Sequence, residues 1–153
     1  MKRILILGGG FAGVECCLKL ESYFANNPDI EITMVSEDNF ILFTPMLPQV
    51  ASGTIETRHI VTPIRTLINK TKFYEAKIKH IDPHGQSVTL DGTNENRGML
   101  LHYDFLIVAL GSKTNFFGMK NVEENSYQMN TINDAIILRN RIIDLMEQAE
   151  NET

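Results

Sequence analysis

The sequence predicts an α/β fold in which a parallel βαβ sheet is followed by a small antiparallel β-meander and a C-terminal helix. Three observations lead to this prediction. A short apolar run near the N-terminus is followed by three glycines, a helical pattern and a second strand-like run, which together have the length of one βαβ unit. Two strand patterns flank a polar turn in mid-chain, and apolar side chains recur at helical spacing near the end.

The first part of the chain contains the predicted βαβ unit. Residues 3–7 form a continuous apolar run, which is typical of a parallel strand buried on both faces. Residues 11–25 place apolar side chains on one helical stripe, and the Asn-Asn-Pro-Asp sequence of residues 26–29 ends this helix in a turn. Residues 30–35 alternate in polarity and are rich in β-branched side chains, as expected of the second strand.

The middle of the chain is less regular. Residues 38–57 carry two prolines and a glycine among apolar side chains, and a short helix is predicted over residues 60–69. Residues 73–81 have the pattern of one strand, residues 82–85 form a turn, and residues 87–90 are its hairpin partner. These strands are expected to belong to the antiparallel meander.

The last part of the chain is predicted to contain a loop, a strand and a long helix. Residues 91–98 are polar and loop-like, and residues 100–110 are predicted as one buried strand that ends at a glycine turn. An amphipathic helix is predicted over residues 131–149, where Thr131 with Asp134 resembles a capping box. The apolar stripe of this helix consists of Ala135, Leu138, Ile142, Leu145 and Met146.

Length and composition limit the class of protein. At 153 residues the chain is one domain by length, with 43% hydrophobic and 22% charged residues. Its formal net charge is −5 and its 14 lysines and arginines are dispersed, so a nucleic-acid partner is not expected. The apolar runs are too short for a signal peptide or for a membrane span of about 20 residues. A soluble protein, cytoplasmic or peripheral to a membrane, is therefore predicted.

The glycines after the first strand carry the main functional signal. Residues 8–13 match the pattern G-x-G-x-x-G, and they directly follow a buried strand and open a helix. In this context Gly8 permits a tight turn, Gly10 lets the backbone approach a pyrophosphate, and Gly13 lets helix and strand pack closely. The N–H groups and the positive dipole end of the helix would face the phosphates. A Rossmann-like unit that binds the ADP part of a dinucleotide is therefore predicted.

An acidic pair follows the second predicted strand. Glu37 lies at about the spacing from the glycines at which a carboxylate meets the ribose hydroxyls of an unphosphorylated adenosine. A carboxylate accepts hydrogen bonds from two hydroxyls and repels a 2′-phosphate, which disfavours NADP. Asp38, next to it, is expected to share this role in part.

Other chemistries lack the residue patterns that they require. None of the four tyrosines is followed by lysine at the fourth position, as the carbonyl-protonating pair of short-chain dehydrogenases requires. The four histidines form no metal-binding motif, and no G-x-S-x-G nucleophile elbow occurs. Cys16 and Cys17 are adjacent in a predicted helix and are expected to be small side chains that are buried or half-buried. No catalytic residue and no metal site is predicted.

Two further segments resemble a known family. Residues 43–54, Phe-Thr-Pro-Met-Leu-Pro-Gln-Val-Ala-Ser-Gly-Thr, look like the segment after the second strand in type II NADH:quinone oxidoreductases, where it runs close to the flavin. Residues 103–111 resemble the strand and glycine turn that close the first half of the FAD domain. Leu110 stands where the wider superfamily of flavoproteins with two dinucleotide-binding domains usually has threonine, a variant that the quinone-reducing family also shows. The resemblance covers essentially the whole chain.

This resemblance implies which residues bind FAD, and with which part of it. The residues that would cradle the pyrophosphate are Gly8, Gly10, Phe11, Ala12 and Gly13. Glu37, with Asp38 beside it, would hold the adenosine ribose, and a main-chain group around Lys77 would touch the adenine.

The resemblance also implies contacts nearer the flavin, and an activity. Thr44 and Pro45 would lie near the flavin end, and Ala109 and Gly111 would pack on the cofactor. In the family, hydride passes from NADH to the flavin, and two electrons then pass to a quinone at the membrane surface. The cofactor supplies this redox chemistry, which accounts for the lack of an acid–base pair in the sequence.

The chain departs from a complete member of that family. It contains no second glycine fingerprint for NADH, no later return segment that completes the FAD site and no C-terminal membrane-binding region. We therefore expect an N-terminal portion, with an FAD-binding half-domain over residues 1–112 and a connecting segment and helix over residues 113–153. The full-length enzyme would bind NADH and quinone at the inner face of the cell membrane, and this portion alone would be inactive. The oligomeric state stays open, with a homodimer as one option.

Two alternative functions also stay open. The first is a sulfide:quinone oxidoreductase, which needs redox cysteines near the flavin, whereas Cys16 and Cys17 fall on the helix after the glycine turn. The second is a non-catalytic module that senses or stores FAD or ADP, which would bind nucleotide without oxidising NADH.

Overall fold

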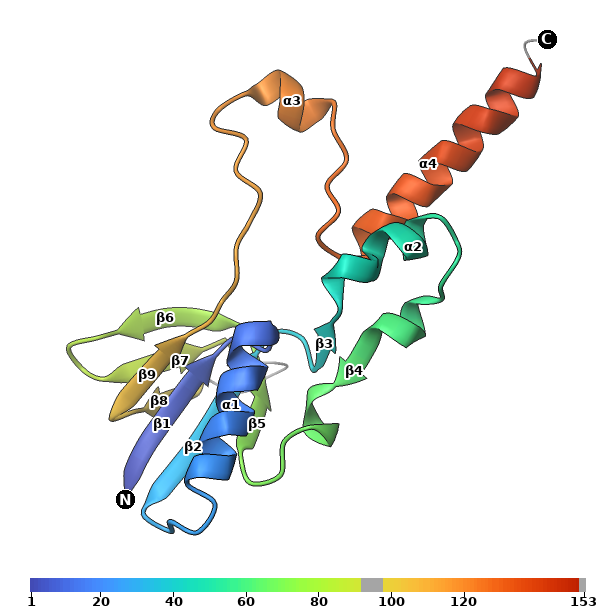
Figure 1. Ribbon diagram of the computed structural model, residues 1–153. Coiled ribbons are helices and arrows are strands. Elements are labelled where there is room, and N and C mark those ends of the chain that lie inside the picture. Colours follow the sequence, from blue (N-terminus) through green and yellow to red (C-terminus); the bar gives the residue numbers. More distant parts are fainter. Residues whose placement is uncertain (92–97, 152–153) are drawn as a thin grey trace. The chain divides into compact units, whose positions relative to one another are not determined.

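The computed structural model describes residues 1–91 and 98–151, so most of the predicted loop over residues 91–98 lies outside the described part (Figure 1). The chain divides into two units. The first consists of Met1–Ile41 with Thr62–Gly111, and the second of Leu42–Val61 with Ser112–Thr153.

A four-stranded parallel sheet forms the centre of the first unit. Its strands are β1 (Lys2–Leu7), β2 (Ile30–Ser36), β5 (Lys72–Glu75) and β9 (Phe105–Val108), in the order β5-β2-β1-β9. Strand β1 pairs in parallel with β2 and with β9, and β2 pairs in parallel with β5. Helix α1 (Phe11–Tyr23) connects β1 to β2, which confirms the predicted βαβ unit, although the helix ends two residues before the expected position.

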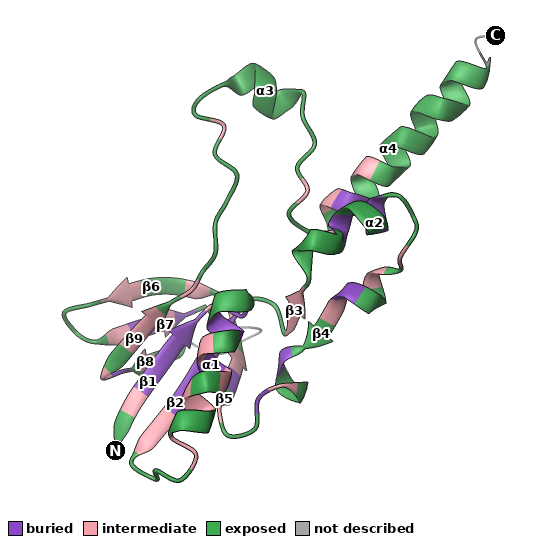
Figure 2. Cartoon of the chain, viewed as in Figure 1, coloured by how far each residue is buried: buried purple, intermediate pink, exposed green. Residues whose placement is uncertain are grey.

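Both faces of the parallel sheet bury apolar side chains, and Figure 2 colours most of β1 and β2 as buried. On one face, Ile6 of β1 packs with Val14 of α1. On the other face, Leu5 and Leu7 pack with Val88 of the antiparallel meander. The meander strands are β6 (Ile78–Asp82), β7 (Ser87–Leu90) and β8 (Leu100–His102). Because neighbouring side chains of a strand point to opposite faces, one apolar run supplies both layers. The predicted α/β fold with a small meander is confirmed.

The predicted strand over residues 73–81 is wrong as a single element, because β5 and β6 belong to different sheets. The N–H of Ala76 donates to the carbonyl of Ser36 at 2.9 Å and so prolongs the pairing with β2. The carbonyl of Lys77 instead accepts from the N–H of Asp91 at 2.7 Å, beyond β7. The chain therefore passes from one sheet to the other between these two residues.

The predicted buried strand over residues 100–110 is also two elements. Strand β8 belongs to the meander and β9 to the parallel sheet. Strand β9 is not buried: Phe105 is 57% exposed and Val108 is 60% exposed. The reason is its position at the edge of the described sheet, where it has one strand neighbour instead of two.

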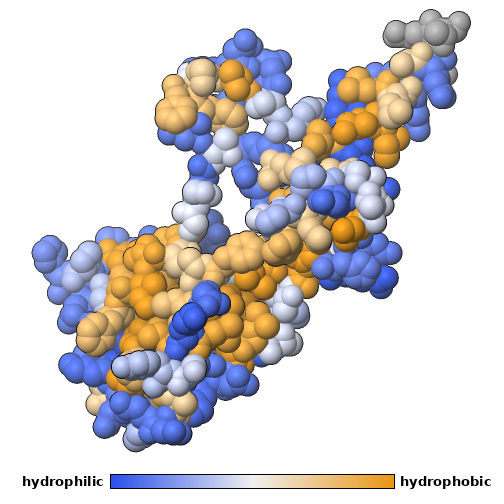
Figure 3. Space-filling model, in the orientation of Figure 1, coloured by the Kyte–Doolittle hydropathy of each residue, from blue (hydrophilic) through white to orange (hydrophobic). Residues whose placement is uncertain are grey.

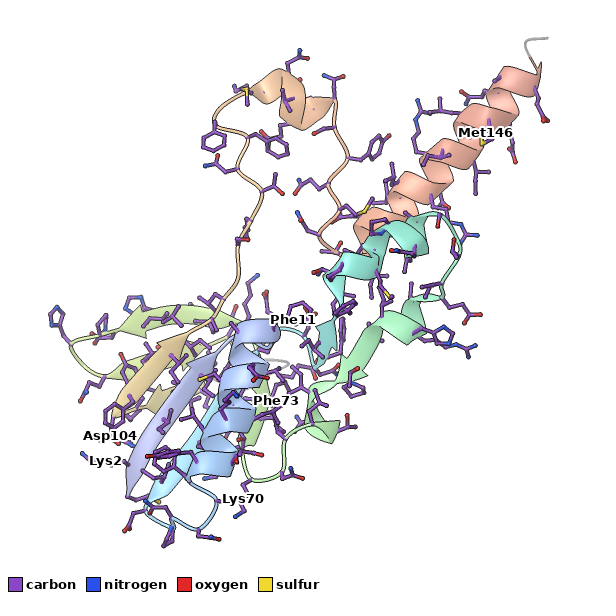
Figure 4. The ribbon with its side chains drawn as sticks, viewed as in Figure 1. Lys2, Phe11, Lys70, Phe73, Asp104 and Met146 are labelled. Carbon is purple, nitrogen blue, oxygen red and sulfur yellow. The ribbon has the colours of Figure 1, made fainter. Side chains whose placement is uncertain are left out.

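Asp104 fixes the start of β9 against β1. Its carboxylate accepts the N–H of Arg3 at 2.7 Å, and its own N–H donates to the carbonyl of Arg3 at 2.9 Å. The ammonium of Lys2 lies 3.8 Å from the same carboxylate, and Figure 4 shows the two side chains together at this end of the sheet. The hydrogen bond from the Arg3 backbone is the main reason why the pKa of Asp104 lies below its usual value.

The predicted helix over residues 60–69 is wrong. This segment contains the end of the 3₁₀ helix Thr57–Ile60, the strand β4 (Val61–Pro63) and the 3₁₀ helix Ile64–Thr66. Ile60, Ile64 and Ile68 are all buried, so the four-residue spacing of apolar side chains is real. Pro63 lies between them, has no N–H to donate and disfavours the helical conformation of the preceding residue, so a continuous helix does not form.

The packed part of the second unit is formed by the helices α2 (Leu47–Ala51) and α4 (Ile132–Asn151). The unit also contains α3 (Lys120–Glu124) and the 3₁₀ helices Thr44–Met46 and Thr57–Ile60. Strand β3 (Phe40–Leu42) pairs with β4 where the chain passes between the units. Leu47 and Val50 of α2 are buried in a cluster with Ala135 of α4.

Helix α4 confirms the predicted C-terminal helix and its capping box. The carboxylate of Asp134 accepts the N–H of Thr131 at 2.9 Å, and the hydroxyl of Thr131 accepts the N–H of Asp134 at 3.1 Å. The predicted apolar stripe is packed only at its start, because the short helix α2 covers Ala135 and half-covers Leu138. Farther along, Met146 is 68% exposed, and apolar side chains reach the surface of this helix (Figure 3).

One carboxylate attaches α1 to the segment before β5. Glu21 accepts the N–H groups of Asn69, Lys70 and Thr71 at 2.7 to 3.1 Å, together with the Thr71 hydroxyl at 2.7 Å. Partial burial by itself would raise the pKa of Glu21, but these hydrogen bonds favour the ionised form and lower it overall. The contact holds α1 against the edge of the sheet.

Replacement of Glu21 by alanine is expected to lower the free energy of unfolding by about 2 kcal/mol at pH 7, because several donors lose a charged acceptor. A lowered pKa means that this contribution is complete above the usual carboxyl range and is lost as the pH falls through the lowered value. Urea unfolding at pH 7 and pH 3 should therefore show a difference between wild type and variant that shrinks in acid. Glu15→Ala, on the same helix and 67% exposed, is the control. An equal difference at both pH values would contradict this role.

Candidate dinucleotide-binding site

The candidate site lies at the carboxyl edge of the parallel sheet, where β1 is followed by α1. The N–H of Gly8 donates to the carbonyl of Val35 at 2.8 Å, and Gly8 has a φ of +108°, which side chains of L-residues disfavour. The first helical bond of α1 joins the N–H of Val14 to the carbonyl of Gly10 at 3.0 Å. The first-turn amides of an α-helix have no intrahelical acceptor, and such a terminus can bind an anion.

Gly8, Gly13 and Ala109 pack closely against one another at this turn. A Cβ built on Gly13 would lie 1.9 Å from the carbonyl oxygen of Gly8, and a Cβ on Gly8 would lie 2.1 Å from that of Ala109. The same Gly13 position would be 3.6 Å from the Cβ of Ala109, an ordinary contact. The first and last glycines of the motif therefore have the predicted structural roles, and Ala109 supplies the third side of the contact.

Gly10 differs from these two glycines. It is the N-cap of α1 with a φ of −77°, and a Cβ built on it would meet no described atom within 4 Å. The following Phe11 is 48% exposed, Figure 4 shows it at the start of α1, and Ala12 is also exposed. The structure therefore leaves open space above the middle glycine, which is where a diphosphate would need to approach the backbone. This geometry fits the ADP part of a dinucleotide.

Ser36 and Ile64, which the sequence prediction did not include, pack against Gly9 in the glycine turn. A Cβ on Gly9 would lie 2.6 Å from the hydroxyl oxygen of Ser36 and 2.5 Å from the Cδ1 of Ile64. Gly9 is buried, unlike Gly10. The run of three glycines is the sequence signal for this contact, because the fingerprint itself requires no glycine at its second position.

The acidic end of β2 faces a lysine that follows β5. The ammonium of Lys77 lies 3.4 Å from a carboxylate oxygen of Glu37, and both side chains are more than 60% exposed. Asp38, next along the chain, is exposed as well. The structure therefore joins Glu37 and Lys77 in a side-chain ion pair that the sequence did not predict. Their contacts with the adenosine stay a prediction.

The other predicted residues are distributed between the two units. Gly111 ends the first unit with a φ of +75°, and a Cβ on it would meet no described atom within 4 Å. Thr44 and Pro45 belong to the second unit, where both are exposed in the 3₁₀ helix Thr44–Met46. Their contact with the flavin stays a prediction.

The cysteines are buried or half-buried, as predicted. Cys17 is buried with its sulfur 3.1 Å from the hydroxyl of Thr71, burial raises the pKa of its thiol, and Cys16 is half-buried. The four histidines are exposed, and no group of metal-ligating side chains occurs within the described residues. No helix in the described part of the chain has the length and apolarity that a bilayer crossing requires.

Comparison with known proteins decides the family. A sequence model of the pyridine nucleotide-disulphide oxidoreductases matches residues 2–146. The chain belongs to this family. An external alternative NAD(P)H-ubiquinone oxidoreductase B4 of mitochondria from Arabidopsis thaliana is 39% identical over 97% of this chain and 26% of the relative. The mitochondrial external NADH-ubiquinone oxidoreductase 2 of Saccharomyces cerevisiae is 33% identical over 98% of the chain and 28% of the relative. The predicted resemblance to NADH:quinone oxidoreductases is confirmed.

Two solved structures share the fold of this chain. NDH2 from Plasmodium falciparum, solved in complex with NADH, has a TM-score of 0.81 and 27% identity over 97% of this chain and 30% of that protein. The sulfide:quinone oxidoreductase of Aquifex aeolicus has the same TM-score, with 28% identity over 96% and 33% of the two chains. The chain thus spans about a quarter to a third of the length of the relatives that it matches.

Proposed function

We propose that the first unit binds the ADP part of FAD and that the chain is the N-terminal portion of an NAD(P)H:quinone oxidoreductase. The observation that carries the proposal is the open space above Gly10 between two tightly packed glycines at a helix N-terminus. Membership of the pyridine nucleotide-disulphide oxidoreductases supports a flavin cofactor. The named relatives support a nicotinamide nucleotide as electron donor and a quinone as acceptor.

For each predicted residue we propose the part of the cofactor that it contacts. The amides of residues 10–13 bind the pyrophosphate, and Glu37, with Asp38 beside it, accepts hydrogen bonds from the ribose hydroxyls. The carbonyl of Lys77 already accepts from Asp91, so its N–H is the group that we propose for the adenine. The residues proposed to contact the flavin side of the cofactor are Thr44, Pro45, Ala109 and Gly111.

In this proposal the chain binds and orients, and FAD, when bound, supplies the redox chemistry by accepting a hydride and giving up electrons one or two at a time. The first-turn amides fix one end of the cofactor, and the Glu37 carboxylate fixes the sugar beside it. Such an arrangement needs no nucleophile and no acid–base pair of its own. We propose that the complete enzyme reaches its quinone as a peripheral protein at the membrane surface.

A sulfide:quinone oxidoreductase is the second candidate, because the Aquifex aeolicus enzyme of that name is as similar in structure as NDH2. The cysteines of this chain do not favour it, since both belong to α1, where Cys17 is buried against Thr71 and Cys16 is only half-exposed. Anaerobic bleaching of bound flavin in a protein that contains this chain distinguishes the two: the proposal expects bleaching by NADH and not by sulfide. Binding of FAD without either reaction would support a non-catalytic module.

The proposal predicts an order of ligand affinities for the chain. FAD and 5′-ADP should bind, FMN should not, and 2′,5′-ADP should bind about tenfold more weakly than 5′-ADP, because its 2′-phosphate meets the Glu37 carboxylate. Glu37→Gln should remove most of this tenfold preference. Isothermal titration calorimetry measures each constant. Tighter binding of FMN than of 5′-ADP would contradict the proposal, because FMN lacks the ADP part.

A further inference from the structure

Two ion pairs join β2 to β5 or the residues that directly follow these strands, one near each edge of the sheet. At the amino edge, Lys72 of β5 lies 2.5 Å from a carboxylate oxygen of Glu31 in β2. At the carboxyl edge, beside the glycine turn, Lys77 lies 3.4 Å from the Oε1 atom of Glu37. The first pair is far from the proposed site, and the second includes the acid that we propose for the ribose. This arrangement allows the role of the second pair to be separated from a general effect of charge.

The pair at the carboxyl edge contributes little to folding. Lys77 is 69% exposed and Glu37 is 63% exposed, and exposed ion pairs stabilise proteins by about 0 to 1 kcal/mol. The two strands are already aligned by their ladder, which the bond from the N–H of Ala76 to the carbonyl of Ser36 extends to the residue before Lys77. The side chain of Asn39 also donates to Glu75 at 3.1 Å. The position of Lys77 therefore calls for a role other than holding the strands.

We propose that Lys77 is a positioning residue for the ribose carboxylate. Its ammonium holds the Oε1 atom of Glu37, which leaves the Oε2 atom for the ribose hydroxyls, and it offsets the charge of Glu37 and Asp38 beside an anionic diphosphate. Without this cation, two carboxylates at the end of β2 would repel the ligand that one of them is required to bind. The inference rests on the proposed ADP site and adds a side chain to it.

The test compares lysine variants for their affinity for 5′-ADP in the intact chain. Lys77→Met should raise the dissociation constant about three- to fivefold at low salt, the range expected of an exposed ion pair, and less at 0.5 M salt. Lys77→Arg keeps the charge and should stay within about twofold of wild type. Lys72→Met removes the same charge from the same two strands at the other edge and should also leave the affinity within about twofold.

A double-mutant cycle shows whether Lys77 acts through Glu37. If it does, Lys77→Met should have less than half of its effect, on a logarithmic scale, in a Glu37→Gln background. Equal effects in both backgrounds would mean that the lysine acts on the ligand directly, and would overturn the inference. Tighter binding by Lys77→Met would overturn it as well, because the lysine would then compete with the ribose.

The proposed function and this inference fail in different ways. If the wild-type chain does not bind 5′-ADP, or if Glu37→Gln leaves its affinity unchanged, the proposed site is wrong. If wild type binds and Glu37→Gln weakens binding, but Lys77→Met matches Lys72→Met, the site stands and the role of Lys77 is wrong. Thermal unfolding of each variant checks that the affinities are compared among folded proteins.

Discussion

Replacement of Gly13 by alanine is expected to destabilise the first unit by about 3 kcal/mol or to prevent its folding. In an ordinary helical position the same change stabilises, since alanine exceeds glycine in helix propensity by about 1 kcal/mol. Here the new Cβ would lie 1.9 Å from the carbonyl oxygen of Gly8, a distance that only a shift of α1 away from β1 can relieve. Overpacking of this kind costs about 1 to 3 kcal/mol even where neighbouring side chains can move, and this neighbour is backbone.

Urea unfolding followed by circular dichroism measures this effect, and Gly10→Ala is the matched control. Its Cβ would meet no described atom within 4 Å, and the φ of −77° at this N-cap suits alanine. The control should unfold within about 1 kcal/mol of wild type, the size of an N-cap change. Equal unfolding midpoints for the two variants would show that the close contact between helix and strand is not as the structure describes it.

Gly10→Ala should have its large effect on binding. The methyl group would occupy the open space above the turn, where we propose that the pyrophosphate approaches the backbone. We expect the affinity for FAD and for 5′-ADP to fall at least about tenfold, because displacement of the diphosphate lengthens several charge-assisted hydrogen bonds at once. Equilibrium dialysis of the folded variant gives the constants. A folded Gly10→Ala protein that binds FAD as tightly as wild type would place the diphosphate elsewhere.

The two variants together separate structure from function within one motif. The sequence motif does not distinguish its three glycines. In the structure Gly8 and Gly13 are in close backbone contacts, whereas the space beside Gly10 is free of described atoms. Substitution of Gly8 or Gly13 should therefore lower the stability of the fold. Substitution of Gly10 should mainly lower the affinity for the ligand.

Local spacing was enough to predict the βαβ unit and the glycine turn. The signals for this unit all lie within residues 3–35: an apolar run, glycines at fixed offsets and a β-branched run. The parallel pairing of β1 with β2 follows from the helical connection between them. The capping box of α4 was predictable for the same reason, because Thr131 and Asp134 are three residues apart and form both hydrogen bonds between themselves.

The strand divisions were not predictable from the pattern. Residues 73–81 keep a strand-like pattern while the chain leaves one sheet and enters another, and the change is visible only in hydrogen bonds to Ser36 and Asp91, which are distant in sequence. The sequence pattern of a helix also appears at Ile60, Ile64 and Ile68, because all three are buried and spaced four residues apart. Pro63, between the first two, prevents a continuous helix. Both errors come from tertiary contacts that override a local period.

The side chains around the glycine turn depend on strand order. Ser36 supports Gly9 because β2 lies next to β1, and Lys77 reaches Glu37 because β5 lies next to β2. Nothing local to residues 72–77 specifies that neighbour. The position of Glu37 just after β2 could be predicted from the local pattern, whereas prediction of its ion-pair partner Lys77 required the fold.

The most direct measurement of the central claim is an amide NMR spectrum of the ¹⁵N-labelled chain during titration with 5′-ADP. The account predicts saturable shifts at Gly10, Ala12 and Gly13 and at Glu37, while amides at the amino edge of the sheet, such as that of Lys72, stay unchanged. Shifts confined to other regions, or no shift at millimolar 5′-ADP, would contradict the claim that this helix N-terminus and the end of β2 together bind the ADP part of the cofactor.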